Sequence, residues 1–460
     1  MGIKIFSCTN KIAFTSRCTS PVLLLILLLA WSNHSRAQDG VSGFLQNYNA
    51  FQTTQGQDLI AARNRLRVQF SRQVGRANLY AETDVIHRYS DEQLADVLLR
   101  EIYFDWFFDK SDLRVGSQVI TWGLSNGGFV TNILSPLDLS EFLTQDPQDL
   151  VLGVTALNLI RYFGDNQLQL IFSPAFQQDR LPEARSRWFP VQTIDSPIPV
   201  NFSENSEPAS LSSIQGAARY SIRSINNIDL DFKLLYWTHP MPAFALNINL
   251  FNFPNLPSVE LDQTYRASPM AGLSADWRFS NNWSLQTEAL YVHRRLFTFL
   301  PVAVNRLEAA LSDFGEALLV LQDFDLRDDG YLLRKPWLHA MIGIQGEALG
   351  TNISLQGYLE TIFNYEDRIL PQQYFPYITA LAARQFFRDR LQLLTLGRYN
   401  FYGDDFWFQL QGIYEISDGL ELALGTNLFG GEPVSPFYGH FTFNQFRENS
   451  FVFSRLALYF

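Results

Sequence analysis

Apolar and polar residues alternate with a period of two along most of the chain after residue 40. The segments NRLRVQF (64–70), NIDLDFKLLYW (227–237) and LSADWRF (273–279) show the pattern clearly. Successive side chains of a β-strand point to opposite faces, so each segment would have one apolar and one polar face. The alternation therefore predicts a protein built mainly from β-strands.

Many of these strands are predicted to be long, and their polar faces carry charges at mid-strand. A soluble sandwich would also alternate, but its strands are usually about 5–6 residues long. Aromatic residues near the ends of the apolar faces are typical of a transmembrane barrel. We predict eighteen strands, at 42–52, 62–72, 76–86, 97–107, 112–122, 151–163, 166–173, 212–223, 227–238, 269–279, 283–296, 334–346, 350–362, 376–387, 389–400, 404–416, 419–429 and 450–460.

Short and long connections alternate between the predicted strands. The short ones are rich in Gly, Asn, Asp and Ser, which suit hairpin turns. The long ones are 123–150, 174–211, 239–268, 297–333, 363–375 and 430–449. Connection 87–96 is only moderately long, and the stretch YGDD after Asn400 is short where the alternation requires a long loop. Outer-membrane barrels have short periplasmic turns and longer extracellular loops. We therefore expect an all-β, antiparallel up-and-down transmembrane barrel of 16–18 strands, with short helices in its extracellular loops.

The chain ends in an apolar, alternating segment, SFVFSRLALYF. Leu456, Leu458 and Phe460 share one face of this predicted strand. A terminal Phe after alternate apolar residues resembles the signal that barrel-assembly machinery recognises. The last strand is expected to pair with the first, because an open edge in lipid would leave backbone groups unsatisfied.

The N-terminal segment resembles a secretory signal peptide. A basic leader precedes the apolar run VLLLILLLAW, and small residues follow as far as Ala37. The run is about half as long as a helix needs to cross a bilayer. We expect cleavage near Ala37, leaving residues 38–460 as a single barrel domain in the bacterial outer membrane. Cys8 and Cys18 both lie in the leader, so the mature chain would contain no cysteine.

Composition excludes some functions. Without the four basic residues of the leader, 31 Lys and Arg remain from 35 against 46 Asp and Glu, a net charge of −15. This acidity argues against binding nucleic acid. The mature histidines are scattered, and no metal-binding spacing or nucleophile motif stands out. We expect no enzyme activity, no cofactor and no metal.

One stretch carries a family resemblance. Leu113–Gly123 reads LRVGSQVITWG and is followed by SPLDLSEF, NLIRYF and LIFSPAFQQDRLP. This order of residues resembles a poorly characterised group of bacterial outer-membrane, porin-like proteins. The resemblance implies a β-barrel in the outer membrane and no particular substrate. The matching residues are Arg114, Gly116, Gln118, Trp122, Gly123, Pro136, Asp138, Pro174, Phe176, Arg180 and Pro182.

Alternation also predicts which polar residues face the lumen of the barrel. Such a mixed-charge wall could sort solutes. Alternatively it could be a pairing network that holds the barrel and anchors an inserted loop, because lumenal charges are usually paired. The candidates are Arg65, Arg67, Glu82, Asp84, Glu101, Asp105, Arg114, Gln118 and Trp122, with Asp138 in the following loop.

Three long loops carry further hypotheses. Loop 123–150 could fold inward and narrow a pore, or could form an external cap; Ser135 is placed as the N-cap of a helix. Loop 297–333 has a helical apolar face, with Asn305 and Glu308 as a capping box. This helix could pack on the loops or plug the mouth of the barrel, or it could contact a partner or the membrane. Loop 174–211, with Arg180, Arg185, Arg187 and Trp188, could bind an anionic ligand or could be a solvated, proline-stiffened loop.

We therefore expect a passive or weakly selective pore for small solutes. The alternative is a barrel with a filled lumen that acts as a receptor, adhesin or envelope-structural protein; an outer-membrane hydrolase is a weaker alternative. The expected partners are outer-membrane lipid, lipopolysaccharide and the barrel-assembly machinery. The sequence does not decide the oligomeric state.

Overall fold

The structure is a computed structural model. It describes residues 39–54, 58–89, 95–183, 186–189, 200–203, 213–249, 258–322, 330–432, 439–440 and 442–460. The expected signal peptide and Arg185 lie outside these residues.

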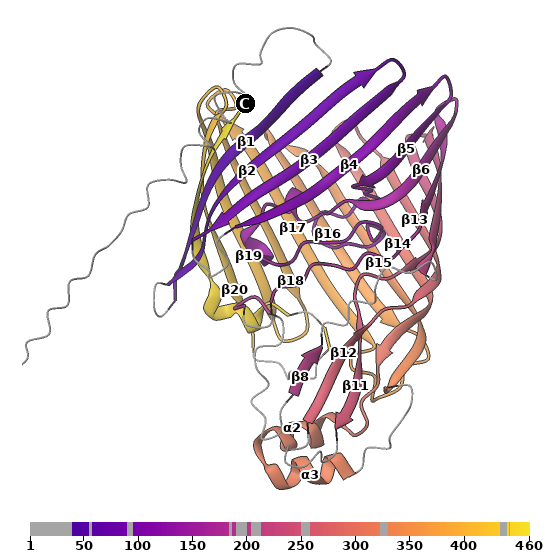
Figure 1. Ribbon diagram of the computed structural model, residues 1–460, viewed down its shortest axis with the longest axis vertical. Coiled ribbons are helices and arrows are strands. Elements are labelled where there is room, and N and C mark those ends of the chain that lie inside the picture. The colour runs from indigo at the N-terminus through magenta and orange to yellow at the C-terminus, as the bar shows by residue number, and fades with distance from the viewer. Residues whose placement is uncertain are drawn as a thin grey trace, which may run out of the picture.

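Eighteen antiparallel strands form one closed barrel, which confirms the predicted fold class (Figure 1). Each strand pairs with the next along the barrel wall, and the last pairs with the first. All eighteen predicted strands are present, with ends displaced by a few residues. They are β1 (Asp39–Gln52), β2 (Leu59–Val74), β3 (Ala77–Arg88), β4 (Asp96–Phe108), β5 (Ser111–Gln118), β6 (Val154–Phe163), β7 (Asn166–Ser173), β9 (Gln215–Ile225), β10 (Ile228–Thr238), β13 (Ala267–Arg278), β14 (Trp283–Thr298), β15 (Leu332–Ala348), β16 (Thr351–Ile362), β17 (Tyr374–Phe386), β18 (Leu391–Asn400), β19 (Asp405–Ser417), β20 (Leu420–Gly430) and β21 (Phe451–Tyr459).

Strand β10 shows why the alternating sequence forms a barrel wall. Phe232, Leu234 and Tyr236 are exposed on its outer face, whereas Asp231 and Lys233 are buried on the inner face. An apolar outer face suits contact with lipid, and the inner face places its polar groups where the lumen can satisfy them.

The two ends of the barrel differ. One end carries the tight turns and the C-terminus, and we call it the short-turn end; the other is the long-loop end (Figure 1). The connection 401–404 between β18 and β19 is short although it lies at the long-loop end. Within the described residues, no helix is both long and apolar enough to cross a membrane.

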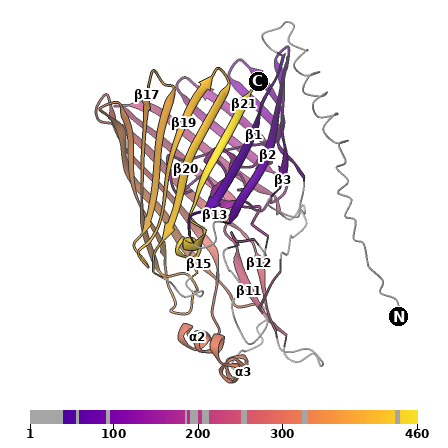
Figure 2. The same ribbon diagram turned by 90° about the vertical axis from the view of Figure 1, so that its left-hand side faces the viewer.

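Strand β21 closes the barrel beside β1 (Figure 2). Phe460 and Gly43 exchange two backbone hydrogen bonds, with N···O distances of 2.9 and 3.0 Å. Leu456 and Leu458 lie on the same face of β21, and both are exposed there. Whether assembly machinery recognises Leu456, Leu458 and Phe460 stays a prediction.

Deleting Phe460 is therefore expected to lower the yield of folded barrel. The deletion removes two closing hydrogen bonds, each contributing about 0.5–1.5 kcal/mol net, together with an exposed aromatic side chain. The measurement is the fraction of heat-modifiable protein recovered from outer membranes. Phe460→Ala keeps the backbone bonds, so a loss of yield in this variant too would show that the side chain matters.

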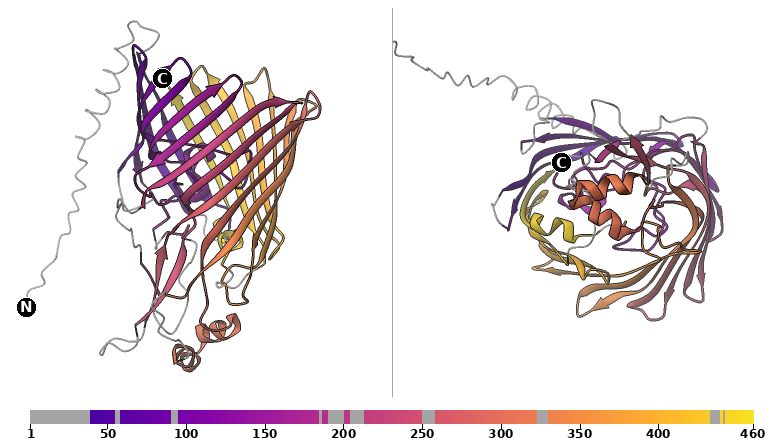
Figure 3. Two further views of the ribbon diagram at one scale, coloured as in Figure 1. Left: turned by 90° about the vertical axis from the view of Figure 1, so that its right-hand side faces the viewer. Right: turned by 90° about the horizontal axis from the view of Figure 1, so that it is seen from below.

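The long-loop end carries elements that the alternation did not predict. Three short strands form a separate small sheet: β8 (Val200–Ser203), β11 (Ala243–Asn249) and β12 (Ser258–Thr264). Helices α2 (Val304–Ser312) and α3 (Phe314–Gln322) lie beyond this end of the barrel. Seen from below, the two helices lie in front of the barrel opening (Figure 3).

The prediction of one helix with a capping box at Asn305 and Glu308 was wrong. Helix α2 begins after Ala303 without a side-chain cap. It ends at Ser312, and the Oδ1 of the next residue, Asp313, accepts a hydrogen bond from the backbone N–H of Glu316 at 2.9 Å. Asp313 thus caps the start of α3, and this cap splits the apolar stretch into two helices.

Candidate functional site

Residues 119–153, which connect β5 to β6, fold into the lumen, and we call them the inserted segment (Figure 1). Their contacts with both sides of the barrel wall confirm the hypothesis that loop 123–150 folds inward. The helix expected to begin at Ser135 is absent, and the Ser135 hydroxyl instead accepts the backbone N–H of Ile120 at 2.8 Å. Two short 3₁₀ helices follow instead, η1 (Phe142–Thr144) and η2 (Pro147–Asp149).

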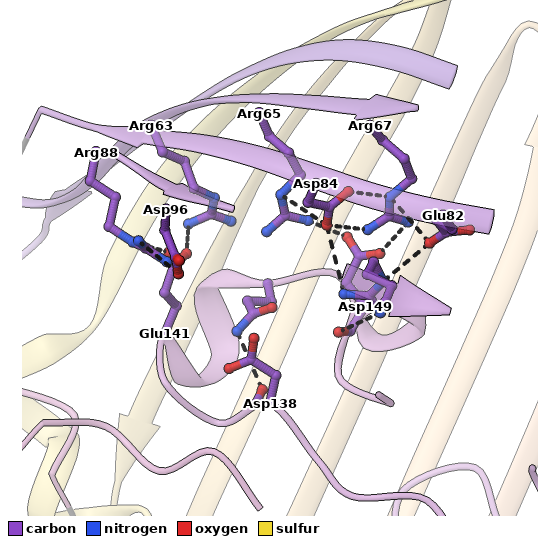
Figure 4. Close-up of polar contacts among 12 residues, drawn as sticks. Arg63, Arg65, Arg67, Glu82, Asp84, Arg88, Asp96, Asp138, Glu141 and Asp149 are labelled. Atoms are coloured by element: carbon purple, nitrogen blue, oxygen red, sulfur yellow. Dashed lines mark hydrogen bonds and ion pairs between the residues drawn. The ribbon is translucent and has the colours of Figure 1, made fainter. Parts of the chain in front are cut away.

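A row of arginines on β2 meets one side of the inserted segment. Arg63, Arg65 and Arg67 are alternate residues, and their exposed fractions are 3%, 2% and 7%. Their side chains project from the wall toward the part of the segment that carries Glu141 and Asp149 (Figure 4). A buried guanidinium requires a charged partner.

Asp149 is a central partner of this row. One carboxylate oxygen lies 2.6 Å from Arg65 Nη1, and the other lies 2.8 Å from Arg67 Nη1. Arg100 of β4 donates to the backbone carbonyls of Asp149 and Val151, at 3.1 and 2.8 Å. Three arginines of the wall therefore hold the last turn of the segment.

The other acidic residues of the segment bind neighbouring strands. Glu141 pairs with Arg63 at 2.5 Å and with Arg88 of β3 at 2.6 Å. Asp146 pairs with Arg455 of β21. The segment thus binds four strands of the wall, β2, β3, β4 and β21, and its carboxylates supply charge that the arginines need.

The wall contributes two carboxylates of its own to this cluster. Asp84 accepts both Nε and Nη2 of Arg67, at 2.7 and 2.8 Å, in a bidentate pair. Glu82 lies 3.1 Å from Nε of Arg100. Positive and negative groups are closely matched, so the pairing-network interpretation describes this part of the wall.

The remaining predicted lumen residues form separate groups. Arg114 pairs with Asp105 at 2.6 Å, outside the arginine row. The Gln118 side chain accepts from Asn158, and Trp122 Nε1 donates to Gln169 at 3.0 Å. Glu101 accepts the backbone N–H of Val119, and Asp138 lies 3.6 Å from Arg180.

Sequence reasoning missed most of the charged cluster around the arginine row. Arg63 could have been found, since it precedes Arg65 by two residues on the same strand face. The missed partners in the segment are Glu141, Asp146 and Asp149. They lie in or directly before the short helices η1 and η2, which are too short to give a periodic signal. The other missed residues are Arg88, Asp96, Arg100 and Arg455.

Glu288 of β14, on the opposite side of the wall, holds residues 124–131, which we call the tip of the segment. Its carboxylate accepts the backbone N–H groups of Leu124 and Thr131, at 2.8 and 2.9 Å, and also the Thr131 hydroxyl. Lys233 of β10 donates to the same hydroxyl at 2.7 Å. Glu288 is therefore the anchor of the tip.

The tip also reaches β16 and β17. The backbone N–H of Asn126 donates to Gln356 at 2.8 Å, and its side-chain amide donates to Ser354 at 3.0 Å. A Cβ at Gly127 would lie 2.5 Å from the Thr379 side chain, so only glycine permits this approach. The inserted segment therefore crosses the lumen from β2–β4 to β14–β17.

Apolar packing fixes the segment near the long-loop end. Phe142 contacts Trp188 and Phe446, with ring centroids 5.4 and 4.8 Å apart. Trp188 is buried, and Arg180 pairs with Asp96 at 2.6 Å. Both residues of loop 174–211 thus make contacts within the barrel.

Asp179 links loop 174–211 to the inserted segment and gives this contact a pH dependence. Its carboxylate accepts the backbone N–H of Leu137 at 2.8 Å. Burial raises its pKa to about 7, although the Leu137 hydrogen bond opposes the shift. The folded state therefore binds the proton more tightly than the unfolded state, so this contribution to stability is present at low pH and is lost as the pH rises from about 4 to 7.

We expect residues 136–139 to exchange their amide hydrogens faster at pH 8 than at pH 5.5, after correction for the intrinsic pH dependence of exchange. Asp179→Asn should abolish the corrected difference, because the amide does not ionise. Equal corrected exchange rates at the two pH values in the unaltered protein would contradict the raised pKa of Asp179.

The family model described as "Protein of unknown function (DUF1302)" matches residues 43–328, which is more than half of the chain. The chain belongs to this family. It is also similar to two solved outer-membrane porins. Pseudomonas aeruginosa OccK2 (OpdF) is 9% identical with a TM-score of 0.51, and the match covers 92% of this chain and 97% of that one. Acinetobacter baumannii OccAB2 is 8% identical with a TM-score of 0.50, covering 92% and 98%.

Identities this low show a common fold and nothing about a common solute. No curated protein matches the chain. In this member of the DUF1302 family, the barrel and its inserted segment are therefore the features that bear on function.

Proposed function

We propose that the protein is an outer-membrane porin-like channel through which small solutes diffuse, with the inserted segment as its constriction. The observation that carries the proposal is a closed eighteen-stranded barrel whose lumen is crossed by a segment bound through polar contacts to both walls. Barrels of about 16–18 strands are wide enough to enclose an aqueous lumen.

The charge pattern supports passive or weakly selective diffusion. Arg67 is paired with Asp84 and Asp149, and Arg63 with Glu141, so this part of the wall presents little unbalanced charge. Selectivity among ions follows the net charge at a constriction. A balanced network should therefore discriminate only weakly between cations and anions.

The same proposal includes export and assembly. Residues 1–37 direct the chain across the inner membrane and are removed near Ala37, and residues 38–460 form the barrel domain. The terminal face of Leu456, Leu458 and Phe460 presents the assembly signal. Outer-membrane lipid and lipopolysaccharide contact the exposed outer face, and we assign the barrel no catalytic role and no cofactor.

A second candidate is a filled barrel that acts as a receptor, adhesin or envelope-structural protein. One observation favours it: a cluster of buried apolar side chains, including Trp237, Leu290 and Trp337, packs against Trp122 and Val130 of the inserted segment. Such packing could seal the long-loop half of the lumen.

Conductance of the purified full-length mature barrel in planar bilayers separates the two candidates. The channel proposal predicts stepwise, ohmic openings that are nearly independent of which monovalent ion carries the current. Asp109→Asn should leave the openings unchanged, because the Asp109 side chain is 86% exposed on a turn and pairs with Arg76, which is also exposed. A silent bilayer with folded, heat-modifiable protein would favour the filled barrel.

A further inference from the structure

A cavity of about 470 Å³ lies at the short-turn end of the barrel, and we call it the vestibule. Small-molecule sites in proteins usually measure about 300–1,000 Å³, so this volume suits a small solute. Asn126, at the tip of the inserted segment, lines it. The other lining residues come from the turn 279–282 and from β13 to β17: Arg278, Ser280, Asn281, Asn282, Trp283, Ser284, Gln345, Gly346, Glu347, Asn352, Ile353, Ser354 and Leu381.

The lining is rich in neutral hydrogen-bonding groups. It contains five side-chain amides and three hydroxyls but only one cation and one anion, Arg278 and Glu347. Arg278 already has a carboxylate nearby, Asp229, at 3.5 Å. The vestibule therefore offers little net charge and many groups that can both donate and accept hydrogen bonds.

Several of these groups are available to a solute. Asn126 uses its amide to bind Ser354 at 3.0 Å. In contrast, within the described part of the chain, the side-chain amides of Gln345 and Asn352 make no hydrogen bond. A hydroxyl group, which both donates and accepts, is the natural complement of such an amide.

We propose that the vestibule binds an uncharged polyhydroxyl solute, of the carbohydrate class, next to the tip of the inserted segment. The inference rests on the proposed channel function, because it places a recognition site on the solute path. It also names a property that conduction alone does not require, namely a preference for hydroxyl groups over charge.

Isothermal titration of the folded barrel in detergent with maltose tests the proposal without relying on conduction. Gln345→Leu combined with Asn352→Leu removes two of the available amides and should weaken maltose binding by about tenfold or more, from the loss of two hydrogen-bonding groups. Gln411→Leu is the matched control, because Gln411 lies on β19 outside the vestibule. Its affinity for maltose should equal that of the unaltered barrel.

The outcomes separate the inference from the channel proposal. Binding of maltose that the double variant weakens and the control variant retains supports the inference, whether or not the barrel conducts. No maltose binding by folded protein overturns it, even if bilayers show openings. Tighter binding of sodium gluconate than of maltose also overturns it, because charge would then dominate recognition.

Discussion

Replacing Asp149 with asparagine is expected to increase single-channel conductance severalfold and to shift selectivity toward anions. Asp149 carries the charge shared by Arg65 and Arg67, and all three side chains are at least about nine-tenths buried. Removing one partner of a buried ion pair typically costs about 3–5 kcal/mol. That cost is enough to release the part of the inserted segment around Asp149. Arg65 loses its closest carboxylate, whereas Arg67 keeps its bidentate pair with Asp84.

Conductance and the reversal potential in a salt gradient measure the two effects separately. Release of the inserted segment raises conductance, whereas the loss of one negative charge beside Arg65 moves the reversal potential toward that of the anion. Asp109→Asn removes one carboxylate from an exposed turn and should change neither quantity. A folded Asp149→Asn barrel with unaltered conductance and selectivity would show that this part of the segment does not border the solute path.

Replacing Glu288 with alanine is expected to release the tip of the inserted segment from β14. Hydrogen bonds to a charged group contribute about 1.5–3 kcal/mol each, and Glu288 accepts three from Leu124 and Thr131. We expect larger conductance with more frequent fluctuations, and faster amide exchange over residues 124–131.

Glu421→Ala is the control for this variant, since Glu421 accepts from Tyr459 on the neighbouring strand and not from the segment. Unchanged exchange over 124–131 in the Glu288 variant would contradict the anchoring role. Asp149 and Glu288 hold different parts of the inserted segment, so the effects of the two substitutions on its release should be nearly additive.

The barrel was predictable from the sequence because each strand carries its own signal. In β10, the alternation of Asp231 and Lys233 with Phe232 and Leu234 records which face meets lipid and which meets the lumen. Turn residues then mark where each strand ends. Closure by β21 follows from the physical cost of an open edge in lipid.

The path of the inserted segment was not predictable from the sequence, because its residues carry no alternating signal like that of the strands. An aspartate in a turn, such as Asp149, has the same local sequence whether it faces solvent or a row of arginines. Its role depends on Arg65 and Arg67, which lie more than eighty residues earlier in the chain. Likewise, the strand β8 pairs with β12 across a long stretch of sequence, and its few residues give no periodic pattern.

The central claim is that the position of the inserted segment sets the width of the solute path. A cysteine pair, Gly127→Cys with Thr379→Cys, tests it in the Glu288→Ala background. A Cβ at Gly127 would lie 2.8 Å from the Thr379 Cβ, so a shift of about 1 Å gives the spacing of a disulfide. The expected mature chain has no other cysteine that could compete.

Single-channel conductance, recorded before and after reduction of this disulfide, is the most direct measurement. Our account predicts a small, steady conductance while the tip is tethered to β17, and a severalfold larger one after reduction. Equal conductance in the two states, with the cross-link verified by mass spectrometry, would contradict it.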